Sequence, residues 1–326
     1  MELAAPAALD PLLFSVDLPL RKTYYPHGFP VTIVTNSGEV VEAAEESWAD
    51  GSPRFPEPPI EVRVTVAEAE PGGLPDAPVF RGLGHLVAIV SDARNFAVWD
   101  REKQFAALCL SSRVAQERDW LRFHFLEAVV YVALAQLYLT PLHAACVAHR
   151  GNGVLLCGGP GAGKSSLAYA CARRGWTYVA DDASSLVRGR GDRLVLGRPG
   201  QIRFRQDADR LFPELAGRLA RRRANGKIAI EVRTAELGNI ATAYESRADY
   251  IVFLNRPSRS PAGAKPVERE RALERILRAV PLLGESVRRE QEASVGALLA
   301  AEAFELEYTD LGPAIDCLEE LIERRG

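Results

Sequence analysis

The sequence has few of the residues that form metal and redox sites. Its 326 residues include five cysteines and five histidines, and the cysteines are scattered without a C-x-x-C pair. Three cysteines fall in apolar runs, so we expect reduced thiols in the core of a cytoplasmic protein. His27 and His85 have no spaced partner, which is more typical of surface or core residues than of metal ligands.

The sequence also lacks an evident export signal or membrane span. Residues 1–13 have neither the basic start nor the sustained apolar core of a signal peptide. The most apolar stretch, residues 125–142, contains Glu127 and Gln136 and is too short for a span, so it predicts a buried helix. The net charge of −3 gives no reason to expect binding to nucleic acid or to an anionic membrane.

The composition, 47% hydrophobic and 25% charged residues, is that of an ordinary globular protein, and the length allows two domains. We expect a β-rich accessory domain over residues 1–115. Its predicted strands lie at 31–35, 39–42, 60–66, 85–90 and 96–99. The first two flank Asn36-Ser37-Gly38, a plausible hairpin loop.

A helical run over 112–139 leads into the second domain, residues 116–326. Strands and helices alternate there, which predicts an α/β fold with a mainly parallel sheet. Further helices are expected at 207–223, 268–283, 294–303 and 313–324, and a buried strand at 250–254. The basic cluster at Arg218 and residues 221–223 is either a solvated helix face or a subsite for an anionic substrate.

One motif determines the functional interpretation. It matches G-x-x-x-x-G-K-[ST] and consists of Gly158, Gly159, Pro160, Gly161, Ala162, Gly163, Lys164 and Ser165. An apolar strand at 153–157 precedes it, and a helix at 164–174 follows and ends at Gly175. This order favours phosphate binding at a helix N-terminus.

The motif predicts ATP and Mg²⁺ as cofactors. Lys164 would contact the β- and γ-phosphates, the Ser165 hydroxyl would ligate Mg²⁺, and the nucleotide contacts would extend to Ser166. The alternative is a glycine-rich turn with Lys164 merely solvated, but such a turn does not need glycines at these spacings.

A second predicted strand, residues 176–180, ends in Asp181 and Asp182. Ligands of open α/β sheets bind beyond the carboxyl ends of strands, next to the phosphate loop. One carboxylate could take the proton of an acceptor hydroxyl while the other orients Mg²⁺. Adjacent side chains of an extended segment point in opposite directions, which favours two roles. A polar turn that caps the next element is the alternative.

His143 lies on a strand predicted over 142–148, and residues 151–153 turn that strand back toward the phosphate loop. The imidazole could approach the γ-phosphate or support a catalytic carboxylate. A lone histidine beside an apolar strand is, however, more often a core residue.

Residues 143–182 resemble the catalytic domain of HPr kinase/phosphorylase and of the broader group of HprK-like serine kinases. The shared blocks are His143-Ala144, Gly151-Asn152-Gly153-Val154-Leu155-Leu156, the motif at 158–165, Arg174-Gly175 and Val179-Ala180-Asp181-Asp182. The resemblance implies a P-loop kinase domain of HPr kinase type, with a mixed or parallel sheet and flanking helices. It also implies that Asp181 is the general base and that His143 assists it.

The segment Ile230-Glu231-Val232-Arg233 resembles the family's Leu-Glu-Ile-Arg, which makes Glu231 a candidate Mg²⁺ ligand beside Ser165 and Asp182. Ser166 and Thr234 stand where the HPr-specific enzymes usually have Glu and Gly. The chain therefore fits the broader group better than the HPr-specific enzymes.

These features predict an ATP- and Mg²⁺-dependent kinase that phosphorylates a hydroxyl, most simply a serine of a protein or peptide. A small-molecule kinase and a non-catalytic ATP-binding regulator are the alternatives. Asn-Lys-x-Asp and Leu-Ser-Gly-Gly-Gln motifs are missing, which argues against a GTPase and a transporter ATPase. HPr kinases form hexamers, so the resemblance also allows a homo-oligomer.

Overall fold

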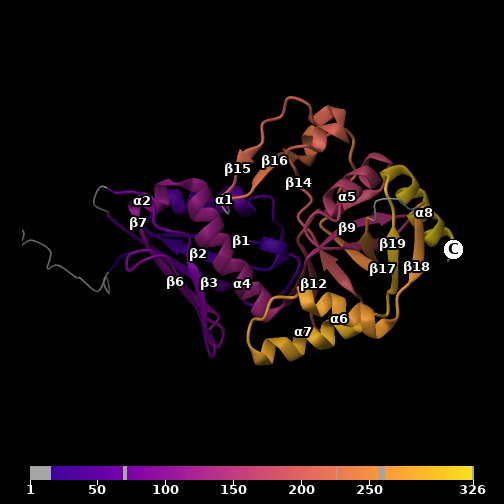
Figure 1. Ribbon diagram of the computed structural model, residues 1–326. Coiled ribbons are helices and arrows are strands. Elements are labelled where there is room, and N and C mark those ends of the chain that lie inside the picture. The colour runs from indigo at the N-terminus through magenta and orange to yellow at the C-terminus, as the bar shows by residue number, and fades with distance from the viewer. Residues whose placement is uncertain (1–15, 69–71, 225, 257–260, 325–326) are drawn as a thin grey trace, which may run out of the picture. The chain divides into compact units, whose positions relative to one another are not determined.

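The computed structural model describes residues 16–68, 72–224, 226–256 and 261–324. Residues 1–13, for which the sequence predicts no signal peptide, lie outside the described residues. The chain is a mixed α/β protein with parallel and antiparallel strands and flanking helices, as the sequence predicts. It forms two compact units, Met1–Ala133 and Leu134–Gly326 (Figure 1).

The division between the units lies further along the chain than the predicted boundary at residues 115 and 116. The reason is that the helical segment after residue 111 packs on the first unit. Arg118 forms ion pairs with Glu42 and Glu46 there, and the Arg122 side chain donates to the hydroxyl of Ser47 at 3.0 Å.

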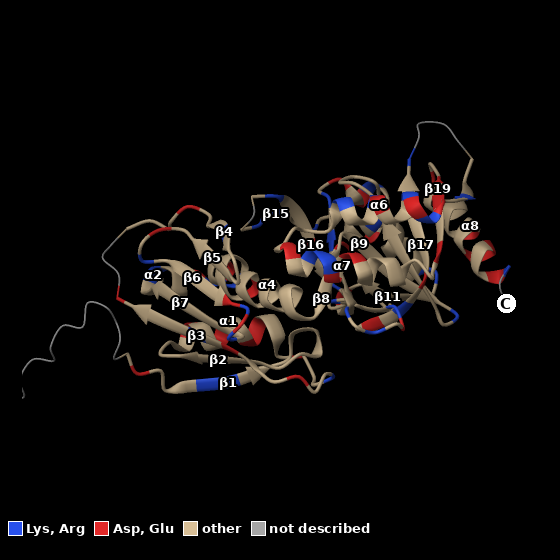
Figure 2. Cartoon of the chain, turned by 90° about the horizontal axis from the view of Figure 1, so that it is seen from below, with Lys and Arg blue, Asp and Glu red and all other residues tan. Residues whose placement is uncertain are grey.

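The first unit is built on a seven-stranded sheet. In spatial order its strands are β1 (Leu20–Tyr24), β2 (Val31–Thr35), β3 (Ile60–Ala67), β7 (Phe105–Ser111), β6 (Phe96–Asp100), β5 (Leu86–Val90) and β4 (Val79–Leu83). Strands β2, β3 and β7 run parallel, and the other neighbours are antiparallel. The edge strand β1 carries Arg21 and Lys22, the blue band in Figure 2, which pair with Glu61 and Glu45. Charged edge strands of this kind resist unwanted strand pairing.

The predicted hairpin around Asn36-Ser37-Gly38 is wrong, because the residues after it form helix α1 (Gly38–Trp48). Ser37 caps this helix by accepting the N–H of Val40 at 3.4 Å. Val40, Ala44 and Trp48 recur at helical spacing and are buried. The helix makes the crossover that lets β2 and β3 pair in parallel.

The expected helical run is a series of shorter helices. They are α2 (Ser112–Gln116), α3 (Arg118–Leu121), the π-helix η2 (Arg122–Leu126) and α4 (Glu127–Leu137). Among the described residues, Arg118–Leu137 is the one helical stretch long and apolar enough to span a membrane, with a mean hydropathy of 1.2, and 56% of it is buried. A core helix has the same properties. The apolar run predicted as one buried helix divides into α4 and the strand β8 (Leu139–Leu142).

The second unit contains a nine-stranded sheet. Seven of its strands follow one another in the spatial order β11 (Thr177–Ala180), β9 (Ala144–His149), β10 (Asn152–Cys157), β17 (Glu245–Asn255), β13 (Leu194–Leu196), β12 (Ser184–Val187) and β8. The other two strands are β19 (Glu302–Glu307), which pairs with β17, and β18 (Gly263–Pro266), which pairs with β19. The pairs β10–β17 and β17–β19 are parallel, and most of the others are antiparallel.

The expectation of a mainly parallel sheet is therefore wrong for this unit. A tight turn, with positive φ at Arg150 and Gly151, joins β9 to β10 as an antiparallel hairpin. The two parallel pairs still bring the carboxyl ends of β10, β17 and β19 to one edge of the sheet. That edge carries the glycine-rich motif.

Helices cover both faces of this sheet (Figure 1). One core contains side chains of α5 (Lys164–Arg173) and α8 (Leu311–Glu323), and the other contains side chains of α6 (Arg269–Ala279) and α7 (Glu285–Leu298). Strand β10 serves both cores, because Val154 and Leu156 face the first while Leu155 faces the second.

A small three-stranded sheet replaces the helix predicted at 207–223, which is wrong. Pro213 and Gly217, with a φ of +79°, interrupt the helical pattern. The segment forms short 3₁₀ turns at Ala208–Arg210, Pro213–Leu215 and Thr234–Glu236, and the strands β14 (Gln201–Phe204), β15 (Arg221–Arg222) and β16 (Ile228–Arg233). The helix predicted at 294–303 is also wrong beyond Leu298, since β19 begins at Glu302.

Asp249 on β17 provides a test of the second unit's stability. It is 1% exposed, pairs with Arg193 at 3.2 Å and with Arg247 at 2.7 Å, and accepts the N–H of Gly153 at 3.2 Å. We expect Asp249→Ala to lower the free energy of unfolding by about 3 kcal/mol, because the buried N–H of Gly153 and the mostly shielded guanidinium of Arg193 lose their partner. Urea unfolding followed by circular dichroism measures this change.

Asp316→Ala is the matched control. Asp316 pairs with Arg174 at 2.6 Å, but both side chains are exposed, so the loss should stay below about 1 kcal/mol. Equal effects of the two substitutions would contradict a structural role for the buried carboxylate.

Candidate active site

The glycine-rich loop, residues 158–163, joins β10 to α5 in the predicted order. Gly161 and Gly163 have φ values of +84° and +94°, a region that favours glycine. A Cβ on Gly163 would lie 2.6 Å from the hydroxyl of Tyr308, and one on Gly158 would lie 2.7 Å from the Ala162 Cβ. The loop therefore needs glycine at these three positions, and no described side chain caps the N-terminus of α5 by a hydrogen bond.

Lys164, the first residue of α5, has a buried side chain whose ammonium group lies close to three acceptor atoms. Its side chain is 6% exposed. The Nζ atom donates to the carbonyl oxygen of Gly158 at 2.8 Å and lies 3.1 Å from His143 Nε2 and 3.3 Å from Asp182 Oδ1. Two of its three N–H donors thus have hydrogen-bond acceptors in the protein, and the carboxylate of Asp182 lies within ion-pair distance.

His143 lies between β8 and β9 rather than inside the predicted strand. Because Lys164 can only donate, the Nε2 of His143 accepts, which places the imidazole proton on Nδ1. That Nδ1 lies 3.2 Å from Asp182 Oδ1, within ion-pair distance. Burial lowers the pKa of His143, the charge of Asp182 raises it and that of Lys164 lowers it, and the net shift is downward. The hydrogen bond from Lys164 requires a neutral imidazole, and the lowered pKa of His143 favours the same neutral form.

Asp181 and Asp182, which follow β11, occupy different environments. Asp181 is 6% exposed, and its Oδ2 accepts the backbone N–H of Arg203 at 2.8 Å. Burial raises the pKa of Asp181 and the charge of Asp182 raises it further, against the opposing charge and hydrogen bond of Arg203. The Asp182 side chain is 50% exposed and free to turn toward solvent. The two carboxylates are therefore suited to separate roles.

The predicted metal ligands are only partly brought together. Asp182 lies beside Lys164, and Ser165 is the next residue of α5. Within the described residues there is no group of three or more His, Cys, Asp or Glu side chains that could hold a metal ion. Asp182 and Ser165 nevertheless fit Mg²⁺, which in phosphoryl-transfer sites takes one or two protein oxygens and completes its shell with water and substrate phosphates.

Glu231 lies on β16 between two arginines. Its Oε1 is 2.9 Å from Arg203 Nε and 2.8 Å from Arg223 Nε. Burial alone would raise the pKa of Glu231, but the hydrogen bond of Arg203 and the charge of Arg223 outweigh burial and lower it. These ion pairs tie Glu231 to the segment that holds Asp181, and its assignment as a metal ligand stays a prediction.

Two residues that sequence reasoning missed support the site from distant segments. The Tyr308 hydroxyl, just after β19, donates to the carbonyl oxygen of Ala162 at 3.0 Å. Arg203 holds Asp181 through its backbone and Glu231 through its side chain. Neither belongs to a local motif, so the sequence carries no signal for these contacts.

No family model matches the chain, and no curated protein matches its sequence. Among the solved structures that are similar is the HPr(Ser) kinase/phosphatase from Coxiella burnetii, with a TM-score of 0.31 and 14% identity over 57% of this chain and 99% of that one. A likeness this low carries no conclusion about activity, so the chemistry must be inferred from the site.

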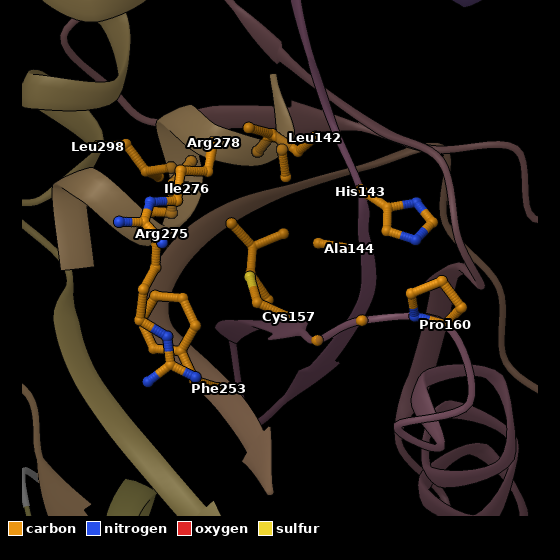
Figure 3. Close-up of a pocket in the computed structure, with 14 residues that line it drawn as sticks. Leu142, His143, Ala144, Cys157, Pro160, Phe253, Arg275, Ile276, Arg278 and Leu298 are labelled. Carbon is orange, nitrogen blue, oxygen red and sulfur yellow. The ribbon is translucent and has the colours of Figure 1, made fainter. Parts of the chain in front are cut away.

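A cavity of about 340 Å³ adjoins the start of the loop (Figure 3). His143 and Pro160 lie on one side of it, and Ile276 and other residues of α6 lie on the other. Its walls are mostly apolar. They consist of Leu142, Ala144, Leu155, Cys157, Phe253, Ile276, Ala279 and Leu298, with His143, residues 158–160, Arg275 and Arg278 at its margins.

The burial of Asp181 predicts a specific pH dependence of stability. The pKa of Asp181 is raised on folding, so the unfolded chain loses this proton first as the pH rises. Stability should therefore fall from the ordinary carboxyl range up through the raised pKa. Asp181→Asn keeps an oxygen to accept the Arg203 N–H and removes the titration. We expect the variant to be more stable than the wild type by roughly 1 kcal/mol at pH 7 and equal to it near pH 3.

Urea unfolding at a series of pH values tests this expectation. Asp182→Asn is the control, because its half-exposed carboxylate should give no comparable gain. A difference between Asp181→Asn and the wild type that does not change with pH would contradict the expected effect of burial.

Proposed function

We propose that the protein is an ATP- and Mg²⁺-dependent kinase that transfers the γ-phosphate to a hydroxyl, that of a serine in a protein or peptide. The observation that carries the proposal is the convergence on one buried ammonium group. Lys164, at the end of the glycine-rich loop, contacts His143 and Asp182, and the buried Asp181 directly precedes Asp182 in the chain.

In this proposal the terminal phosphates lie against Lys164. A phosphate oxygen replaces the carboxylate or imidazole as acceptor for one of its N–H groups, and the backbone N–H groups at the start of α5 bind the inner phosphates. Asp182, once it no longer pairs with Lys164, would hold Mg²⁺ together with Ser165. The bound Mg²⁺ would neutralise part of the phosphate charge. His143 is a positioning residue, because it orients both Lys164 and Asp182.

Asp181 is the proposed general base. The phosphoryl group moves from ATP to the acceptor oxygen, and the hydroxyl proton moves to the Asp181 carboxylate. A pKa raised by burial makes this carboxylate a better proton acceptor than an ordinary aspartate. The hydrogen bond from Arg203 fixes its second oxygen. The resemblance of residues 143–182 to the HprK-like kinases gives the same role to Asp181 and favours a serine acceptor.

Removing the ammonium group should weaken nucleotide binding. Lys164→Ala deletes charge-assisted hydrogen bonds to phosphate, so we expect the Kd for Mg·ATP to rise about 10- to 100-fold. Isothermal titration calorimetry measures the change. Lys265→Ala is the control, because that lysine is exposed and pairs with Glu307 on β19. An unchanged Kd in Lys164→Ala would contradict the assignment of the loop.

Asp181→Asn separates catalysis from binding. We expect phosphoryl transfer to fall by about 10²- to 10⁴-fold while the Kd for Mg·ATP stays near that of the wild type. The assay follows the γ-phosphate of radiolabelled ATP into serine peptides and, in parallel, into small hydroxyl metabolites. Transfer only to metabolites would favour a small-molecule kinase, and tight ATP binding without any transfer would favour a regulatory nucleotide binder. Full transferase activity in Asp181→Asn would show that another group is the base.

A further inference from the structure

We propose that the 340 Å³ cavity beside the loop binds an apolar side chain of the acceptor peptide, next to the serine that receives the phosphate. This inference rests on the proposed function. Its volume is at the lower end of the range of about 300–1,000 Å³ that is usual for small-ligand pockets.

The cavity lies beside the place where the terminal phosphate of ATP would bind. Gly158 and His143 line it, and both contact the Nζ of Lys164. In a loop of this kind the lysine reaches the β- and γ-phosphates. The cavity therefore opens where the transferred group would lie, and its margin at His143 is next to Asp182.

The nucleoside belongs on the other side of the loop. The loop residues 161–163 are not part of the cavity lining. A Cβ on Gly161 would lie 3.6 Å from the guanidinium of Arg205, and one on Gly163 would lie 3.5 Å from Arg256 Cδ. Cationic side chains thus flank the part of the loop that leads to the inner phosphates. An acceptor in the cavity would approach the γ-phosphate from the side opposite the leaving ADP, as in-line transfer requires.

The walls of the cavity favour an apolar occupant over a charged one. The Arg275 guanidinium lies over the Phe253 ring at 4.0 Å and pairs with Glu305 at 2.6 Å, so its charge is already matched. Arg278 pairs with Glu274 on the same helix. The stacked Arg275 and Phe253 fix one wall between β17 and α6 (Figure 3), so the cavity is present before a peptide binds.

The experiment uses the full chain with Mg·ATP and short peptides with one central serine. The residue directly before or directly after this serine is Ala, Leu, Phe, Asp or Lys. Burying a Leu or Phe side chain should raise kcat/KM at least about tenfold over the Ala peptide, in one of the two positions. Asp and Lys should give no gain there.

Ala279→Trp tests whether the cavity causes this preference. Ala279 is exposed at the end of α6 and lines the cavity, so a Trp side chain can fill the space without disturbing the core. We expect the preference for Leu or Phe to disappear while the Kd for Mg·ATP stays unchanged. Ala300→Trp is the matched control, because Ala300 is exposed but does not line the cavity.

Three results would overturn the inference. The first is a preference for Leu or Phe that survives in Ala279→Trp. The second is a protein that binds ATP but transfers phosphate to peptides without preferring an apolar neighbour, or to no peptide at all. The third is a weaker Kd for Mg·ATP in Ala279→Trp alone, which would assign the cavity to the adenine base. A wild-type protein that does not bind Mg·ATP would instead refute the proposed function.

Discussion

The site depends on the burial of one positive charge. The Lys164 ammonium is almost fully shielded from water, and a charge in that position is stable only if every donor has an acceptor. The three acceptors come from three separate segments: the end of β10, the junction of β8 and β9, and the residues after β11. Satisfying one side chain therefore fixes the relative positions of three parts of the sheet. In the proposed reaction, a phosphate that replaces one acceptor would enter a site whose geometry is already set.

The neighbouring aspartates show how environment separates two identical groups. Asp182 is half exposed and lies within ion-pair distance of Lys164, while Asp181 is buried and receives a single backbone N–H. Burial moves the pKa of Asp181 upward, which makes it a better proton acceptor than an ordinary aspartate. The backbone N–H of Arg203 on β14 connects this carboxylate to the small sheet, where Glu231 pairs with Arg203 and Arg223. The small sheet thus has a structural link to the proposed chemistry.

Patterns of neighbouring residues predicted those parts of the site that are formed by one continuous stretch of the chain. The strand, loop and helix around residues 158–163 and the strand before Asp181 follow from apolar runs, glycines and one helix terminus. The hairpin at 36–38 failed because the short run at 39–42 also fits the start of α1, and the helix at 207–223 failed because Pro213 and Gly217 outweigh helical spacing. The direction of the strands, the contacts of Arg203 and Tyr308, and the cavity depend on tertiary packing. Residues that meet only in the folded chain leave no pattern in one sequence.

The hydrogen bond between Tyr308 and Ala162 also has a consequence for how the protein forms in the cell. The two residues are 146 positions apart, and β19, which places Tyr308, pairs with the central strand β17. A ribosome must therefore add a further 146 residues after Ala162 before the loop gains this support. Synthesis proceeds at about 5–20 residues per second, so the glycine-rich loop waits about 7 to 30 seconds in an unsupported form. Nascent chains would consequently gain the full geometry of the loop only after β17 and β19 have been synthesised.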